Sequence, residues 1–197
     1  MASGQSGERR PRSDTLRNRA KILDVALRHF SEHGIGTSLE AIAKDAGVGP
    51  ATLYRHFPQR EALLAAALHV RGEELLARRS EIERIADPDE ALRQWMRVLE
   101  DYLSLFSGLP DPVISALEEG DSPLAVSCQN LIAITDELLR PAQRDGTARA
   151  SVQADTLFLS ALSLAWVRSA GTADSASLEA LRAMTETGYA SGAGRRP

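Results

Sequence analysis

Side chains that can bind a polyanion gather in one short stretch of the sequence, residues 49–57. After small groups at its start come a hydroxyl, a phenol, a guanidinium and an imidazole, carried by Thr52, Tyr54, Arg55 and His56. This order of groups suits a helix that enters the major groove of DNA. The sequence holds no metal-ligand cluster, no phosphate-binding glycine loop and no nucleophile–base grouping at a telling position. We therefore predict a nucleic-acid-binding protein that is not an enzyme and needs no cofactor or metal.

Two short helices joined by a tight turn are predicted over residues 37–57. Thr37 is a good N-cap for the first helix, and Glu40 three residues later completes a capping box. Gly47 supplies the left-handed residue that ends this helix. Pro50 suits the first position of the second helix, because no N–H is required there. On the second helix, two apolar residues four positions apart pack inward and leave the polar side chains outside. These inward residues are Leu53 and Phe57.

The chain resembles the N-terminal domain of the tetracycline-repressor (TetR) family of transcriptional regulators. The resemblance rests on the run TSLEAIAKDAGVGPATLYRHF and on Arg60-Glu61-Ala62-Leu63 shortly after it, and it covers about residues 14 to 68. One departure is Gly49, where many relatives carry a side chain that caps the helix and touches phosphate. Backbone N–H groups are then the expected phosphate contact at this point. The alternative to this interpretation is a helical hairpin with no role on DNA.

The resemblance implies a role for each exposed residue of the second helix. Tyr54 and His56 are expected to bond phosphate oxygens, and Arg55 is expected to read a base edge, best a guanine. Phosphate contacts are also implied where the helices before and after it begin. The alternative for any one of these residues is an ordinary place on the surface. The predicted DNA-binding residues are Thr37, Ser38, Gly49, Pro50, Ala51, Thr52, Tyr54, Arg55, His56 and Arg60.

Charge is divided unevenly along the chain. Residues 1–60 hold ten Arg or Lys against six Asp or Glu, whereas the remainder holds 13 against 21, and the whole chain carries a net charge of −4. A basic N-terminal third on an acidic body fits nucleic-acid binding at one end. Cys128 is the only cysteine, which excludes an intramolecular disulfide and is typical of a reducing cytoplasm. No apolar run approaches the roughly 20 residues needed to span a bilayer, and no secretory signal is recognisable. We predict a cytoplasmic protein with no membrane partner.

Helical periodicity continues to the end of the chain, so we predict an all-α fold of about nine helices. In the family, three helices bind DNA and a larger helical body serves dimerisation and ligand binding. The body is similar to the SbtR-like subgroup through Asp121-Ser122-Pro123-Leu124, Cys128 and the run from Leu138 to Gly146. The predicted segments are a disordered basic arm (1–12), a helix-turn-helix domain whose first helix is capped by Ser13 or Asp14 (13–58), a connecting helix (59–86), a ligand-binding and dimerisation domain (87–190) and a flexible tail (191–197).

Apolar residues of the body have two interpretations each. The aromatic residues at helical spacing form either core or an apolar pocket for a small molecule, with a few polar groups that fix the ligand. The last two helices either close the monomer core or form an isologous dimer interface. The predicted pocket residues are Trp95, Leu99, Tyr102, Phe106, Asn130, Phe158 and Trp166. The predicted dimer residues are Leu157, Ala161, Leu164, Ala165, Leu178, Leu181 and Met184.

Together these features predict a ligand-responsive transcriptional repressor. It binds a palindromic operator in double-stranded DNA as a homodimer and is released by an unidentified small-molecule effector. The alternative is a DNA-binding regulator or activator of the same fold that has no small-molecule effector.

Overall fold

The computed structural model describes residues 10–191, which form nine α-helices and no strand beyond an isolated bridge between Ala148 and Ala190. The predicted all-α fold is thereby confirmed. Of the predicted tail at 191–197, only Ser191 falls among the described residues.

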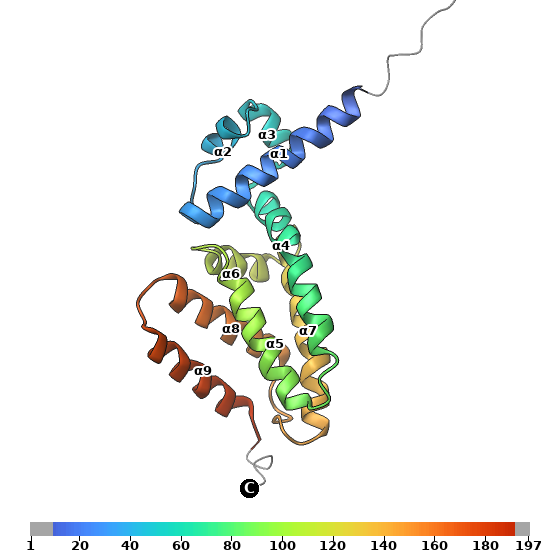
Figure 1. The fold of residues 1–197 in the computed structure, drawn as a ribbon, viewed down its shortest axis with the longest axis vertical. Helices are drawn as coiled ribbons and strands as arrows, with labels where there is room; N and C mark the ends of the chain where they lie inside the picture. The colour runs from blue at the N-terminus through green and yellow to red at the C-terminus, as the bar shows by residue number, and fades with distance from the viewer. Residues whose placement is uncertain (1–9, 192–197) are drawn as a thin grey trace, which may run out of the picture.

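Figure 1 shows three helices grouped at one end of the long axis and a long fourth helix running from them into the body. The fifth and seventh helices pack on this fourth helix, and the eighth and ninth lie on the other side of the fifth. We call the first group the head and the last five helices the body. The head helices are α1 (Arg10–His33), α2 (Leu39–Asp45) and α3 (Pro50–His56); the connecting helix is α4 (Arg60–Ile82); the body helices are α5 (Pro88–Leu103), α6 (Pro110–Glu119), α7 (Pro123–Arg144), α8 (Ala154–Ser169) and α9 (Ser175–Tyr189).

The start of α1 differs from the prediction. We expected a disordered arm over residues 1–12 and a cap at Ser13 or Asp14, but α1 begins at Arg10 and runs through these positions. The first nine residues lie outside the described part of the chain. Pro11 is compatible with this start, because the N–H groups of a first helical turn have no intrahelical partner and a residue without an N–H loses nothing there. The predicted cap is therefore wrong.

The core of the head forms where α1 packs on α2 and α3. Ile22, Ala26 and Phe30 of α1 are fully buried, as their spacing predicted. They belong to one apolar cluster with Ile42 of α2 and Leu53 of α3, which are also fully buried. Burial of each large apolar side chain contributes roughly 1.5–3 kcal/mol, so these contacts hold two helices of seven residues that would not be stable alone.

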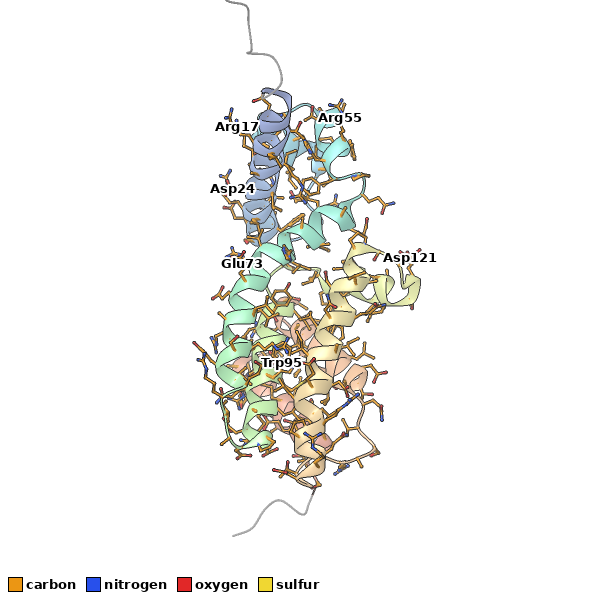
Figure 2. All side chains as sticks on the ribbon, turned by 90° about the vertical axis from the view of Figure 1, so that its right-hand side faces the viewer. Arg17, Asp24, Arg55, Glu73, Trp95 and Asp121 are labelled. Carbon is orange, nitrogen blue, oxygen red and sulfur yellow. The ribbon has the colours of Figure 1, made fainter. Side chains whose placement is uncertain are left out.

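Polar groups inside the body are satisfied locally. Trp95 of α5 is fully buried, and its indole N–H donates to the Thr135 hydroxyl of α7 at 2.8 Å (Figure 2). That hydroxyl donates in turn to the Leu131 carbonyl one turn earlier, also at 2.8 Å. Tyr102 of α5 donates its phenolic O–H to the Leu68 carbonyl of α4 at 2.8 Å, and burial raises the pKa of Tyr102, so the phenol stays a donor. These bonds fix α5 against both α4 and α7.

The head meets the body at a joint formed by the end of α1 and the segment after α5. The rings of Phe30 and Phe106 lie edge to face with centroids 5.7 Å apart. Next to them the Ile35 N–H donates to the Ser107 carbonyl at 2.9 Å. Gly34 has a φ of +74°, and a Cβ at this position would lie 2.8 Å from the same Ser107 oxygen. Only glycine allows this backbone conformation and this close approach together.

The last helix is attached by few buried side chains and by a buried ion pair. α9 buries only Leu178 and Tyr189 of its own residues. Arg182 of α9 donates from Nε and Nη2 to the two carboxylate oxygens of Glu100 on α5, at 2.7 Å each, and Arg168 of α8 places Nη1 3.5 Å from the same carboxylate. The Glu100 side chain is only 2% exposed. A buried carboxylate requires such partners, so the position of α9 depends on this ion pair.

Substitution of Gly34 by alanine is expected to lower the free energy of unfolding by about 1–3 kcal/mol, because it adds backbone strain and forces Gly34 and Ser107 apart. Urea unfolding followed by circular dichroism measures the loss. Gly36→Ala is the matched control, because a Cβ there meets nothing within 4 Å and φ is not positive. Equal stability of the two variants would contradict this account of the joint.

Substitution of Arg182 by alanine is expected to lower the free energy of unfolding by about 3 kcal/mol, because Glu100 would stay buried without its main partner. Arg97→Ala is the control: Arg97 lies on the neighbouring surface, 57% exposed, in ion pairs of 3.6 and 3.7 Å, and its loss should cost less than about 1 kcal/mol. Urea unfolding compares the two, and an Arg182→Ala loss no larger than the control would mean that the ion pair does not hold α9.

Candidate nucleic-acid interface

The turn between α2 and α3 fixes the angle at which α3 leaves the head. Gly47 has a φ of +66°, as predicted for the residue that ends α2. Its N–H donates to the Lys44 carbonyl at 3.0 Å, and the Val48 N–H donates to the Ala43 carbonyl at 3.0 Å. This pair of bonds is the Schellman motif, which satisfies the last carbonyls of a helix. The turn is therefore held by backbone bonds and needs no side chain from either helix.

The start of α3 agrees with the prediction. Gly49 is the N-cap, with no side-chain capping bond, and Pro50 occupies the first turn. The carbonyl of Gly49 accepts from the Thr52 N–H at 2.9 Å and from the Leu53 N–H at 3.2 Å. A glycine cap, a proline and then Ala51, all exposed, leave little bulk at this end of the helix. A DNA backbone could approach the main chain closely here.

The two faces of α3 divide as predicted. Leu53 is fully buried and Phe57 is 2% exposed, and the guanidinium of Arg19 on α1 lies 4.9 Å from the centroid of the Phe57 ring. On the opposite side Tyr54 is 42% exposed and Arg55 is exposed. Figure 2 shows Arg55 at the outer end of the head, pointing away from the body. The apolar pair and the cation–π contact thus hold the helix so that Tyr54 and Arg55 face outward.

The cap of α2 differs from the prediction. Ser38, not Thr37, is the N-cap, and its hydroxyl accepts from the Ala41 N–H at 3.3 Å. The helix begins one residue later than expected, so Glu40 is at the second helical position and the predicted capping box does not form. The Thr37 hydroxyl instead lies 3.2 Å from Nδ1 of His29 on α1.

His29 links α1 to both ends of α2. Its Nδ1 bonds the Thr37 hydroxyl, and its Nε2 lies 2.9 Å from the Asp45 carboxylate. Only 12% of the His29 side chain is exposed. Nothing in the sequence singled out His29 for this role, because its partners lie eight and 16 residues away and obey no helical spacing.

Arg60, predicted to contact phosphate, has partners inside the head. Its Nη1 donates to the carbonyls of Ile35 and Thr37, at 2.5 and 2.7 Å. This guanidinium therefore clamps the connection between α1 and α2 from the first turn of α4. A phosphate contact by its other nitrogens stays a prediction.

Glu40 lies between two of the predicted phosphate contacts. Its Oε2 accepts from the Ser38 hydroxyl at 2.7 Å, and its Oε1 accepts from the Tyr54 hydroxyl at 3.1 Å. The hydrogen bond from Ser38, above all, holds the pKa of Glu40 below its usual value, and the bond to Glu40 raises the pKa of Tyr54. Glu40 is thus ionised and Tyr54 is protonated at neutral pH. We had assigned Glu40 to the cap of α2 alone.

None of the predicted pocket residues lines either of two clefts found at the surface of the body. Most are packed in the core, including Trp95 and Phe106, the latter as part of the joint. Asn130 is exposed, and Trp166 is 53% exposed on the outer side of α8. A role for these residues in ligand binding stays a prediction. The fully buried or nearly buried members are Trp95, Leu99, Phe106 and Phe158.

A cleft of about 500 Å³, lined mostly by polar residues, lies at the end of the body away from the head. Its walls come from the start of α5, the connection between α7 and α8, and the end of α9. None of the predicted pocket residues lines it. The lining residues are Asp89, Arg93, Thr147, Arg149, Ala183, Glu186, Thr187, Tyr189, Ala190 and Ser191.

The predicted dimer residues divide between the core and the surface. Five of them are buried within the single chain: four on α8, including Leu164, and Leu178 on α9. Leu181 and Met184 are 36% and 70% exposed, and Leu159 on α8 is 47% exposed. With Trp166 they make four large apolar side chains on the outer sides of α8 and α9, which we call the outer face. The other three buried α8 residues are Leu157, Ala161 and Ala165.

Two family models match the chain. Residues 22–67 match the model of bacterial regulatory proteins of the tetR family, and residues 87–190 match the C-terminal domain of SbtR-like transcriptional regulators. The second match alone spans more than half of the chain. The chain belongs to the TetR family. Its head corresponds to the part of the chain that matches the N-terminal model of this family of transcriptional regulators.

Relatives in the TetR family cover the chain unevenly. RaaS of Mycobacterium tuberculosis, an HTH-type transcriptional regulatory protein, is 31% identical over 140 residues, which are 71% of this chain and 64% of RaaS. An HTH-type regulator of Staphylococcus aureus is 31% identical over 114 residues, 57% of this chain and 60% of that protein. The chain thus matches less than two thirds of the length of these curated relatives.

Solved TetR structures match nearly the whole chain. A TetR regulator from Streptomyces coelicolor is 32% identical, and the match covers 89% of this chain and 99% of that chain with a TM-score of 0.57. FadR from Thermus thermophilus, a TetR-family repressor solved in complex with lauroyl-CoA, is 26% identical. The match covers 91% of this chain and 98% of the FadR chain, with a TM-score of 0.57.

Within residues 10–191 no helix is long and apolar enough to cross a membrane, and no group of three His, Cys, Asp or Glu residues is arranged to hold a metal ion.

Proposed function

We propose that this protein is a ligand-responsive transcriptional repressor that binds a near-palindromic operator as a homodimer. One observation carries the proposal: α3 is held by Leu53 and Phe57 so that Tyr54 and Arg55 project outward from the end of the head. A helix placed in this way can lie in a major groove with its side chains toward the base edges.

Arg55 has the features of a base-reading residue. Its side chain is exposed, and among the described residues it makes no hydrogen bond or ion pair. A free guanidinium can bond both O6 and N7 of a guanine. The hydroxyls of Tyr54 on α3 and Ser38 before α2 lie close to each other on Glu40, and the exposed Gly49 end of α3 allows the DNA backbone to come close. We assign base reading to Arg55 and phosphate contacts to the hydroxyls.

The outer face supports a homodimer. Large apolar side chains that remain exposed together, such as Trp166 and Met184, are typical of an interaction surface. If two copies pair α8 and α9 about a twofold axis that runs along the long axis of the chain, both heads lie at the same end of the pair. Two α3 helices about 34–36 Å apart would then fit successive major grooves, and the operator would be close to palindromic.

Release of DNA requires a second conformation of the body. The head is attached to the body through α4 and through the joint at Phe106 and Ser107. An effector that binds the body better in the second conformation would move α4 and the joint and change the separation of the heads. A coupling free energy of about 1–3 kcal/mol is typical of such systems. FadR of Thermus thermophilus, a TetR-family repressor solved in complex with lauroyl-CoA, supports a small-molecule effector for this chain.

A regulator without an effector is the second candidate. Its support is the close packing around Trp95, where the aromatic side chains are fully buried and the indole N–H already has a protein partner in Thr135. Such a body would serve only as a dimerisation unit. Tryptophan fluorescence over a panel of acyl-CoA and aromatic compounds separates the candidates: saturable quenching supports the effector, and its absence supports the second candidate.

Replacement of Arg55 by alanine is expected to weaken binding to the DNA upstream of the protein's own gene by about 1–3 kcal/mol per protomer, because one bidentate base contact is lost. Gel shifts at a fixed salt concentration measure the affinity. Arg84→Ala is the control, because Arg84 is equally exposed but lies beyond the far end of α4. Unchanged affinity in Arg55→Ala would overturn the assignment of Arg55 to base reading.

Replacement of Met184 by glutamate is expected to convert the dimer to monomers at micromolar concentration, because a charge would be buried without a partner in the outer face. Sedimentation velocity measures the change. Leu76→Glu, at a leucine on α4 that is 52% exposed and outside this face, is the control and should stay dimeric. A monomeric wild type, or a dimeric Met184→Glu variant, would contradict this interface.

A further inference from the structure

The carboxylate of Glu40 accepts hydrogen bonds from both hydroxyls that we assign to phosphate contact. Ser38 at the start of α2 and Tyr54 on α3 each donate to Glu40, at 2.7 and 3.1 Å, and each uses a different carboxylate oxygen. Glu40 is exposed and forms no ion pair within 4 Å to a cation among residues 10–191, although the more distant Arg60 charge also lowers the pKa of its carboxyl. A negative charge therefore lies at the surface where a DNA phosphate would have to approach.

Each hydroxyl can bond either Glu40 or a DNA phosphate, but not both at once. A hydroxyl has one proton to donate, so Ser38 and Tyr54 cannot each bond a phosphate oxygen while they bond Glu40. Carboxylate and phosphate oxygens are both anionic acceptors, and bonds to either are stronger than bonds between neutral groups. The Glu40 carboxylate thus satisfies the same two donors that a phosphate would use.

We propose that Glu40 is a specificity-determining residue that takes the place of a DNA phosphate in the free protein and restrains sequence-independent binding. On a random sequence, attraction is mainly electrostatic, the hydroxyls stay with Glu40, and the carboxylate repels the phosphates. On the operator, contacts of Arg55 to bases hold α3 in place, and the hydroxyls transfer from Glu40 to the phosphate. The inference rests on the proposed DNA-binding function of the head.

The low pKa of Glu40 fits this role. Hydrogen bonds from Ser38, from its own backbone N–H and from Tyr54 all hold the pKa of the carboxyl below its usual value, so the charge is present throughout the neutral range. The position also agrees with the helix dipole, which favours an acidic residue in the first turn of α2. A residue that only stabilised α2 would have no need of the bond to Tyr54.

Substitution of Glu40 by glutamine removes the charge and keeps the size of the side chain. We expect the affinity for a random 20-base-pair duplex, measured by fluorescence anisotropy in 0.1 M salt, to rise about fivefold, as the loss of one nearby repulsion predicts. The affinity for the DNA upstream of the gene should rise less. Glu40→Ala, which removes charge and acceptor together, should give the same result, and thermal melts verify that each variant is folded.

Asp24→Asn is the matched control, because it changes the net charge by the same amount. Asp24 is exposed on α1, and Figure 2 shows it on the opposite side of the head from Arg55. At 0.1 M salt, charges more than about 10 Å apart are largely screened, so Asp24→Asn should leave the affinity for the random duplex unchanged. If the affinity for the random duplex rose equally in Glu40→Gln and Asp24→Asn, net charge alone would explain the effect and the proposal would be overturned.

A double-mutant cycle tests the competition for the Tyr54 hydroxyl directly. Tyr54→Phe should weaken binding to the random duplex little in the wild type, because the hydroxyl is held by Glu40. It should weaken binding more in the Glu40→Ala background, where no acceptor remains at position 40 and the hydroxyl is free to bond phosphate. Additive changes in the binding free energy of the two substitutions would overturn the competition. The proposal would also be overturned if the affinity of Glu40→Gln for the random duplex were unchanged or lower, or if its affinity rose equally for both duplexes. A wild-type protein that binds neither duplex would instead refute the proposed function, and this separates the two failures.

Discussion

The contact between the head and the body is the constraint on which the rest of this structure depends. At Gly34 the chain turns with a positive φ and passes so close to the Ser107 carbonyl that no side chain fits between them. The neighbouring Phe30 and Phe106 rings pack edge to face, and Arg60 clamps the adjacent loop by bonds to two carbonyls. Because the same few residues end α1, begin α4 and follow α5, a shift in the body must reach the head through them.

Apolar and polar contacts have different roles in this chain. The apolar cluster gives each part its stability, as with Leu53 under α3 or Trp95 in the body. Hydrogen bonds and ion pairs add directional contacts at α9 and on the polar side of α3. α9 is held by the ion pair of Arg182 with Glu100, and the polar side of α3 is bonded to α2 through Glu40. Polar contacts are directional, and another anionic group can compete for their donors, which an apolar contact does not allow.

Sequence periodicity predicted which residues of the short helices face inward, because the core of the head is formed by neighbours in sequence. It was less informative for the body. α8 is apolar on nearly all sides, so its pattern could not tell whether Leu157 or Trp166 faces the core. The structure buries Leu157 and exposes Trp166. The pairings of His29 with Asp45 and of Arg60 with Ile35 also had no signal, since polar side chains that meet across a fold obey no fixed spacing.

The sequence by itself determined the helix-turn-helix of the head, since the glycine that ends α2, the proline that starts α3 and the inward pair on α3 act within a few residues of one another. It also determined the all-helical class and the family. Only the tertiary structure decided that Ser38 rather than Thr37 caps α2, that Phe106 belongs to the joint between head and body, and that Glu40 holds the Tyr54 hydroxyl. The physical reason is the distance along the chain over which the contacts act. Turns depend on local backbone geometry, whereas the partner of a buried ring or a surface carboxylate depends on how distant helices pack.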